Sequence, residues 1–189
     1  MGHMAGEPRE VLSVAFICTG NRFRSPLAAA FLARAAADVP LRIVSLGTLE
    51  LGPVPALPEA VEVAERRGLD LGSHRARTIR DVDLGPFDLV LGFERAHLSA
   101  AVVDGGAREG HTFMLAELVS LLDRAPLSVD GAAPAQRARA RIAQAHRLRA
   151  FPAAEFELPD PLGRPVRAQR KIAARLELLV QELAAKLFV

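Results

Sequence analysis

A short apolar run, residues 11–17, ends directly at Cys18, the only cysteine of the chain. A nearly continuous apolar run of this length is typical of a parallel strand that is buried on both faces. A polar turn follows, and Pro26 then opens a stretch rich in Leu and Ala that favours a helix, with Ser25 as its candidate N-cap. The order strand, tight loop, helix directs backbone N–H groups toward an anion. This feature predicts an α/β fold with an anion-binding loop after the first strand.

The same alternation continues along the chain. Further strands are predicted at residues 41–46, 87–91 and 111–115, and further helices at residues 58–68, 95–103 and 165–187. Such alternation favours a single doubly wound α/β domain with a four-stranded parallel sheet flanked by helices. Ligands of these folds bind beyond the carboxyl ends of the strands, which is where Cys18 lies. We therefore predict one domain over residues 9–189, and we interpret residues 1–8 as a cloning remnant and a disordered N-terminus.

Composition narrows the classes of protein to consider. Half of the 189 residues are hydrophobic and the net charge is only +2, which is the balance of a globular protein. No apolar stretch is long enough to span a bilayer, and the N-terminal residues lack the pattern of a secretion signal, so we expect none. A lone cysteine cannot form an intramolecular disulfide, and the histidines are scattered without the spacing of metal ligands. We therefore expect a cytoplasmic protein with no membrane partner, no metal and no other cofactor.

Residues 124–157 differ from the rest because they are rich in Ala, Pro and Arg. Residues 136–149 could form a helix, but Ala fills most of its non-basic positions, so little of it is expected to be buried. One interpretation is a basic arm that contacts an acidic partner or a nucleic acid. The other is a solvated surface insertion, which we favour because no aromatic residue for base stacking is interleaved with the arginines. A nucleic-acid partner is therefore not expected.

The chemistry-bearing pattern is a cysteine and an arginine separated by five residues, Cys18 and Arg24. A thiolate at a helix N-terminus, surrounded by N–H groups and near an arginine, is stabilised and becomes a strong nucleophile. The same N–H groups can hold phosphate oxygens, and the guanidinium of Arg24 matches two of them. Gly20 permits close backbone approach, and Asn21 tolerates a left-handed conformation. The residues predicted to surround the bound phosphate are Thr19, Gly20, Asn21, Arg22, Phe23 and Ser25.

Residues 17–26 resemble the signature of the low-molecular-weight protein tyrosine phosphatase family, in which a hydrophobic residue precedes Cys-x-Gly-Asn-x-Cys-Arg-Ser-Pro. This family also includes arginine phosphatases and thiol-dependent arsenate reductases. Later stretches are similar to the family as well, so that the resemblance covers most of the chain. These stretches are residues 45–47, 68–77 and 87–94 and the pair Asp160-Pro161.

The resemblance implies a role for particular side chains. By this analogy Cys18 is the nucleophile, Arg24 binds the phosphate, and Asp160 is the general acid. Asp160 would then act as the base for the water that hydrolyses the cysteinyl-phosphate. His74 and Glu94 would form a pair behind the loop that holds it through Asn21 and Ser25.

The sequence departs from the family pattern in three ways. Phe23 replaces the second cysteine of the loop, so the reversible disulfide that protects the nucleophile in family members cannot form. Arg22 occupies a position where family members carry a small or aliphatic residue. The chain has no Tyr and no Trp, and the predicted walls of the pocket are Leu49, Leu51 and Leu162. A phosphotyrosine ring would therefore lie in an aliphatic slot without aromatic stacking.

The favoured function is hydrolysis of phosphomonoesters through a cysteinyl-phosphate intermediate, as in a protein tyrosine phosphatase. Its expected partner is a phosphorylated protein or a small phosphomonoester, with phosphate or sulfate held in the loop. An alternative is a single-cysteine arsenate reductase that takes electrons from a small-molecule thiol. Another is a non-catalytic phosphate-binding module. The retained Pro26 and the pair Asp160-Pro161 favour the phosphatase.

Overall fold

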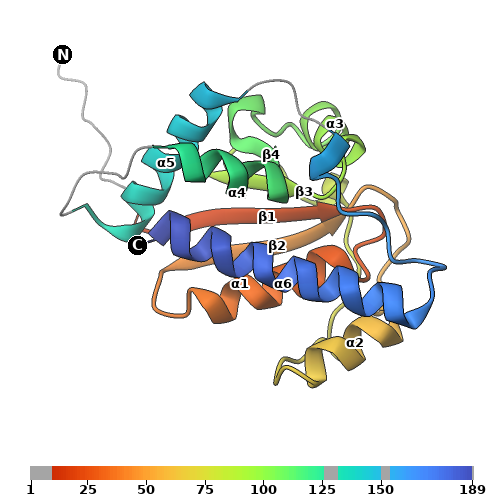
Figure 1. Ribbon diagram of the computed structural model, residues 1–189. Coiled ribbons are helices and arrows are strands. Elements are labelled where there is room, and N and C mark those ends of the chain that lie inside the picture. Colours follow the sequence, from red (N-terminus) through yellow and green to blue (C-terminus); the bar gives the residue numbers. More distant parts are fainter. Residues whose placement is uncertain (1–9, 126–131, 150–153, 189) are drawn as a thin grey trace, which may run out of the picture.

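A four-stranded parallel sheet forms the centre of the computed structural model (Figure 1). The structure describes residues 10–125, 132–149 and 154–188. Residues 1–8, which we interpreted as a cloning remnant and a disordered N-terminus, lie outside the described residues. The strand order is β2-β1-β3-β4, with the first strand between its two partners. The strands are β1 (Leu12–Cys18), β2 (Leu41–Gly47), β3 (Leu89–Gly92) and β4 (Thr112–Met114). The predicted fold class is confirmed.

The register of the sheet brings three strand ends to one point. Cys18 pairs with Gly47 at the end of β2, and Ile17 pairs with Gly92 at the end of β3. A side chain at Gly47 is excluded, because a Cβ there would lie 2.9 Å from the carbonyl oxygen of Thr19. Glycine at this position lets the end of β2 lie directly against the loop that follows β1.

Helices cover both faces of the sheet. The first helix begins at the loop after β1, and α6 runs beside it on the same face (Figure 1). This face and its helices form the larger hydrophobic core, whereas α3 packs on the opposite face against a smaller cluster around Ile17 and Val90. No helix in the described part of the chain is long and apolar enough to cross a membrane. The helices are α1 (Arg24–Ala35), α2 (Pro58–Glu65), α3 (Arg95–Val103), α4 (Leu115–Arg124), α5 (Pro134–Leu148) and α6 (Val166–Phe188).

The structure differs from the prediction at the start of the first helix and in a helix that the prediction lacked. The first helix begins at Arg24, with Phe23 as its N-cap residue, rather than at Pro26 after a Ser25 cap. Pro26 is compatible with this start because the first N–H groups of a helix have no partner within it. The helix α4 is absent from the prediction. It begins at Leu115, directly after β4 ends at Met114, so no turn residue in the sequence marks its start.

The expectation that the basic segment is a solvated insertion is wrong for its described part. The helix α5 packs against α4 and α6, and even Arg141 on it is only 2% exposed. Arg139 pairs with Asp88 at 2.8 Å, and Arg149 pairs with Glu117 at 2.8 Å. Alanine allows this close packing because its side chain is small, and the apolar side of the helix consists of Ala135, Ala138, Ile142 and Ala145. Residues 126–131 and 150–153 lie outside the described residues.

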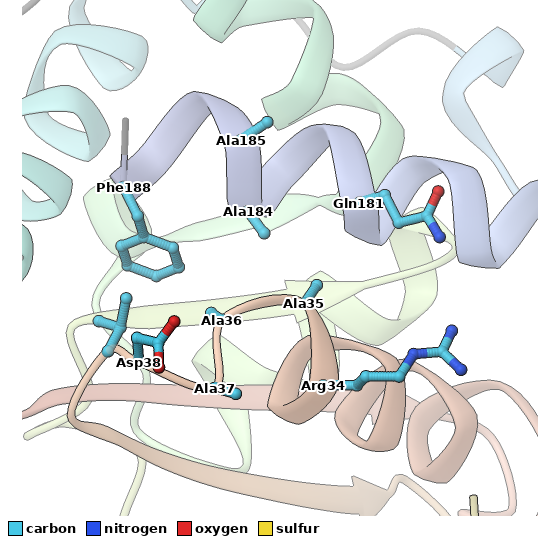
Figure 2. A pocket seen from close by; sticks show the side chains of 10 residues that line it. Arg34, Ala35, Ala36, Ala37, Asp38, Gln181, Ala184, Ala185 and Phe188 are labelled. Carbon is cyan, nitrogen blue, oxygen red and sulfur yellow. The ribbon is translucent and has the colours of Figure 1, made fainter. Parts of the chain in front are cut away.

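A groove of about 480 Å³ lies between the C-terminal ends of α1 and α6 (Figure 2). Alanines at or just beyond the end of α1 and on α6 supply half of its lining, and Asp38 and Phe188 lie at one end (Figure 2). The first helix starts at the loop after β1 and has 12 residues, so about 18 Å of helix separates this groove from that loop. The groove is therefore distinct from the site at the carboxyl ends of the strands.

Candidate active site

The thiol of Cys18 lies at the base of the loop, in a residue that is only 3% exposed. Its Sγ atom is 3.0 Å from the Oγ atom of Ser25. Ser25 has one hydroxyl hydrogen and two possible acceptors for it, because the carbonyl oxygen of Leu46 lies 3.2 Å from the same Oγ. An ionised thiolate is the stronger acceptor. Ser25 is thus placed to donate to the sulfur whenever the sulfur carries a negative charge.

Asn21 holds the loop in shape. It is fully buried and is the only non-glycine residue of the described chain with positive φ, at 51°. Its Nδ2 donates to Ser25 at 2.8 Å and to Ser45 at 3.0 Å, and its Oδ1 accepts from the N–H of Arg77 at 2.9 Å. The Nε2 atom of His74 lies 2.7 Å from the carbonyl oxygen of Asn21. Burial lowers the pKa of His74, which favours a neutral imidazole that donates from Nε2.

Arg24 is the most buried charged group of the site, at 1% exposed. One terminal nitrogen donates to Glu94 at 2.8 Å and to the carbonyl oxygen of Leu158 at 2.9 Å. The other donates to Thr19 at 3.2 Å and to Asp160 at 2.5 Å. These four contacts come from the loop, the start of α3 and the C-terminal segment, so they fix the plane of the guanidinium.

The position of Glu94 corrects the expectation that it acts on the loop through Asn21 and Ser25. Its carboxylate pairs with Arg24 instead, and a second oxygen lies 3.5 Å from His97. The physical reason is that a buried guanidinium requires a counter-charge, whereas Asn21 and Ser25 already bind each other and β2.

Asp160 is brought to the loop by a segment far along the chain. The N–H of Leu158 donates to the carbonyl oxygen of Phe93 at 2.8 Å, which attaches this segment to the end of β3. One carboxylate oxygen of Asp160 accepts from the N–H of Leu162 at 2.9 Å, and the other accepts from Arg24. The side chain remains 40% exposed, so it can reach both the loop and the solvent.

The three leucines that were predicted as walls of the pocket lie near the loop or near Asp160. Leu49 donates its N–H to the carbonyl oxygen of Thr19 at 3.0 Å, and Leu49, Leu51 and Leu162 all have exposed side chains. A cavity of about 280 Å³ lies beside Leu49 and Leu51. Arg22 donates from Nε to the carbonyl oxygen of Pro55 at 2.9 Å. The side chain of Phe23 packs in the hydrophobic core, so only its backbone is available to a ligand.

Sequence comparison identifies the family. The model for low molecular weight phosphotyrosine protein phosphatases matches residues 13–134. The chain belongs to this family. One relative is the "Probable low molecular weight protein-tyrosine-phosphatase EpsP" of Ralstonia nicotianae, which is 32% identical over 108 residues, or 57% of this chain and 73% of the relative. The relatives are named as phosphatases, and the protein is accordingly a phosphatase, which is a hydrolase.

Solved structures of the low molecular weight phosphatases share the fold. A low molecular weight protein tyrosine phosphatase from T. tengcongensis superposes with a TM-score of 0.67 at 27% identity, covering 93% of this chain and 99% of its own. The YwlE arginine phosphatase from Geobacillus stearothermophilus has a TM-score of 0.67 at 25% identity, covering 93% of this chain and 92% of its own.

His97 is a residue of this phosphatase site that the sequence analysis missed, because it grouped His97 with the scattered histidines. The structure places it at 2% exposed, with Nε2 3.1 Å from the Oγ1 atom of Thr19. One sequence feature could have indicated a role for His97. It follows Glu94, the N-cap residue of α3, by three residues, and a side chain at that position can accept a hydrogen bond from the N-cap N–H. Local spacing therefore indicated a capping role, but not the contact with the loop.

Proposed function

We propose that this phosphatase is a cytoplasmic enzyme that hydrolyses phosphotyrosine through a cysteinyl-phosphate on Cys18. One observation carries the proposal: a nucleophile, a phosphate-binding arginine and an acid converge on one loop. Sγ of Cys18 is 3.0 Å from Ser25, and Arg24 bonds directly to Asp160 at 2.5 Å. The cytoplasmic location is supported by the single free thiol, which persists best in a reducing compartment.

In the first step, the loop N–H groups and Arg24 hold the three non-bridging oxygens of the phosphate. The thiolate of Cys18 attacks the phosphorus, and a sulfur–phosphorus bond forms as the ester oxygen–phosphorus bond breaks. Protonated Asp160 transfers its proton to the departing oxygen, which leaves as a neutral alcohol or phenol. In the free enzyme a terminal nitrogen of Arg24 donates one hydrogen to Asp160, and a bound phosphate oxygen would replace the carboxylate as the acceptor of that hydrogen.

In the second step, the ionised Asp160 removes a proton from a water molecule that attacks the cysteinyl-phosphate. The sulfur–phosphorus bond breaks, inorganic phosphate forms, and Cys18 returns to the thiolate. Ser25 donates its hydroxyl hydrogen to the sulfur at this point, because the leaving group then carries the negative charge. Asp160 is protonated again and ready for the next substrate.

The substrate preference follows from the walls and from Arg22. The aliphatic walls provide no aromatic stacking, which is worth about 0.5–1.5 kcal/mol, so the affinity for aryl phosphates is up to roughly tenfold weaker than with an aromatic wall. Arg22 uses Nε for Pro55, and its terminal amino groups have no partner among the described residues. This positive charge beside the loop attracts acidic residues that flank a phosphotyrosine, and it disfavours phosphoarginine.

The proposed function is tested by turnover of an aryl phosphate, acidic and basic phosphotyrosyl peptides, phosphoarginine, and arsenate with a small thiol. Phosphate release is expected from the aryl phosphate and from both peptides, with the acidic peptide preferred. Arg22→Ile is the matched variant, and it should lose that preference while keeping the aryl phosphatase activity. Reduction of arsenate without any phosphate release, or binding of phosphate without turnover, would refute the phosphatase mechanism.

Asp160→Asn should lower kcat by about 10²–10⁴-fold for phosphate esters with poor leaving groups, because the amide cannot donate the required proton. For activated aryl phosphates the loss should be much smaller, since their leaving groups depart without protonation. Measuring kcat across a series of phenyl phosphates of graded leaving-group pKa separates the two cases. An equal loss for all leaving groups would show that Asp160 is not the acid.

A further inference from the structure

The tautomer of His97 is determined by the backbone at the start of α3. Its Nδ1 atom accepts hydrogen bonds from the N–H groups of Phe93 at 3.2 Å and Glu94 at 3.1 Å. An atom that accepts two hydrogen bonds carries no hydrogen itself, so the single hydrogen of the neutral ring lies on Nε2. His97 therefore donates from Nε2 to the Oγ1 atom of Thr19, 3.1 Å away.

This contact determines in turn the direction of the Thr19 hydroxyl. Its Oγ1 atom has two lone pairs, and it accepts from His97 and from a terminal nitrogen of Arg24 at 3.2 Å. With both lone pairs filled, the hydroxyl hydrogen can only be donated to a third group. Within the described part of the chain, no residue accepts a hydrogen bond from this hydroxyl. The same nitrogen of Arg24 donates to Asp160, so the Thr19 hydroxyl and the carboxylate of Asp160 lie beside the same donor group.

We propose that His97 is a positioning residue that makes the Thr19 hydroxyl a hydrogen-bond donor to a phosphoryl oxygen held in the loop. The phosphate then receives a side-chain donor in addition to Arg24 and the loop N–H groups. The inference rests on the proposed function in one respect, namely that a phosphoryl group occupies the loop. It adds a specific residue outside the loop that acts on the substrate only through Thr19.

The surroundings of His97 keep the ring neutral, as the arrangement requires. Burial, and next the positive charge of Arg24, lowers the pKa of His97 to about 4, whereas Asp160 and Glu157 raise it less. Glu94 also faces Nε2, at 3.5 Å. A proton on Nδ1 would be directed at two N–H groups that already occupy that side of the ring. At neutral pH, His97 therefore remains a donor from Nε2 only.

A double-mutant cycle with inorganic phosphate as the probe tests the inference. Thr19→Val should weaken phosphate binding about tenfold, because a hydrogen bond to a charged acceptor is lost. His97→Leu should weaken it by a similar factor when Thr19 is present, but by less than about twofold when combined with Thr19→Val. Thr19→Ser keeps the hydroxyl and should bind phosphate nearly as well as the wild type. An equal penalty for His97→Leu in both backgrounds, or no penalty for Thr19→Val, would overturn the proposal.

The wild-type chain offers a second test that needs no variant to fold. Nitrogen-15 NMR of the His97 ring should show the neutral tautomer with hydrogen on Nε2 throughout the range of about pH 5 to 8, in which an ordinary histidine titrates. A hydrogen on Nδ1, or titration of the ring within that range, would overturn the proposal.

The phosphate affinities of the double-mutant cycle are measured without turnover, so they do not depend on catalysis. A chain that shows the expected cycle but hydrolyses nothing would therefore refute the proposed function and leave this inference intact.

Discussion

Cys18→Ser is expected to abolish hydrolysis while phosphate still binds in the loop. The serine hydroxyl is almost wholly protonated at neutral pH and is a far weaker nucleophile than a thiolate, so kcat should fall by at least about 10³-fold. The proposed phosphate-binding groups should keep their positions, because Arg24 is held by Glu94 and Leu158, and Asn21 fixes the loop through Ser25 and the N–H of Arg77. The substitution thus separates chemistry from binding.

The measurement for Cys18→Ser has two parts. Turnover of an aryl phosphate gives the loss of kcat, and the inhibition or calorimetric binding constant of inorganic phosphate should remain within a few-fold of the wild type. Hydrolysis by the variant at even about a tenth of the wild-type rate would remove Cys18 from the mechanism. A parallel loss of phosphate binding would instead show that the substitution disturbs the loop.

Arg24→Lys should also be nearly inactive, with kcat/KM lower by about 10²–10⁴-fold. A lysine ammonium is a point charge and cannot present two parallel donors to a phosphate. The two terminal nitrogens of Arg24 make four hydrogen bonds, and a lysine has a single nitrogen to replace both. The carboxylate of Glu94 or the carbonyl oxygen of Leu158 would then be left without its donor, at a cost of about 1–3 kcal/mol in the free energy of unfolding.

Arg34→Lys is the matched control for this variant. Arg34 lies in the same helix and pairs with Glu177, but its side chain is partly exposed to solvent. The substitution there should change the unfolding free energy by less than about 1 kcal/mol and leave kcat/KM unaltered. Chemical denaturation and steady-state kinetics of the two variants give the comparison. If Arg24→Lys were as active as Arg34→Lys, the bidentate role of Arg24 in phosphate binding would be excluded.

The residues of the basic segment show where local sequence patterns mislead. Arg139 and Arg149 lie in a stretch rich in Ala, Pro and Arg, and its lack of interleaved aromatic residues favoured a solvated surface insertion. In the folded chain their partners are Asp88 and Glu117, which come from segments 51 and 32 residues away. Charge patterns along a sequence predict only ion pairs between residues three or four apart on one helix. They cannot predict ion pairs between residues 51 or 32 apart. These two arginines therefore attach α5 and its C-terminal end to the body of the phosphatase.

The sequence by itself predicted the first strand, the loop that follows it and the residue types of a phosphate site. Eight consecutive residues, from the last residue of a strand to the first turn of a helix, contain Cys18, Asn21, Arg24 and Ser25. Their arrangement is therefore local, and their residue types are enough to indicate a phosphate site. Only the tertiary structure decided what holds that site. The contacts of Arg24 with Glu94 and Asp160 span 70 and 136 residues, and that of Thr19 with His97 spans 78. Contacts at such separations depend on how strands and helices pack, which no local pattern contains.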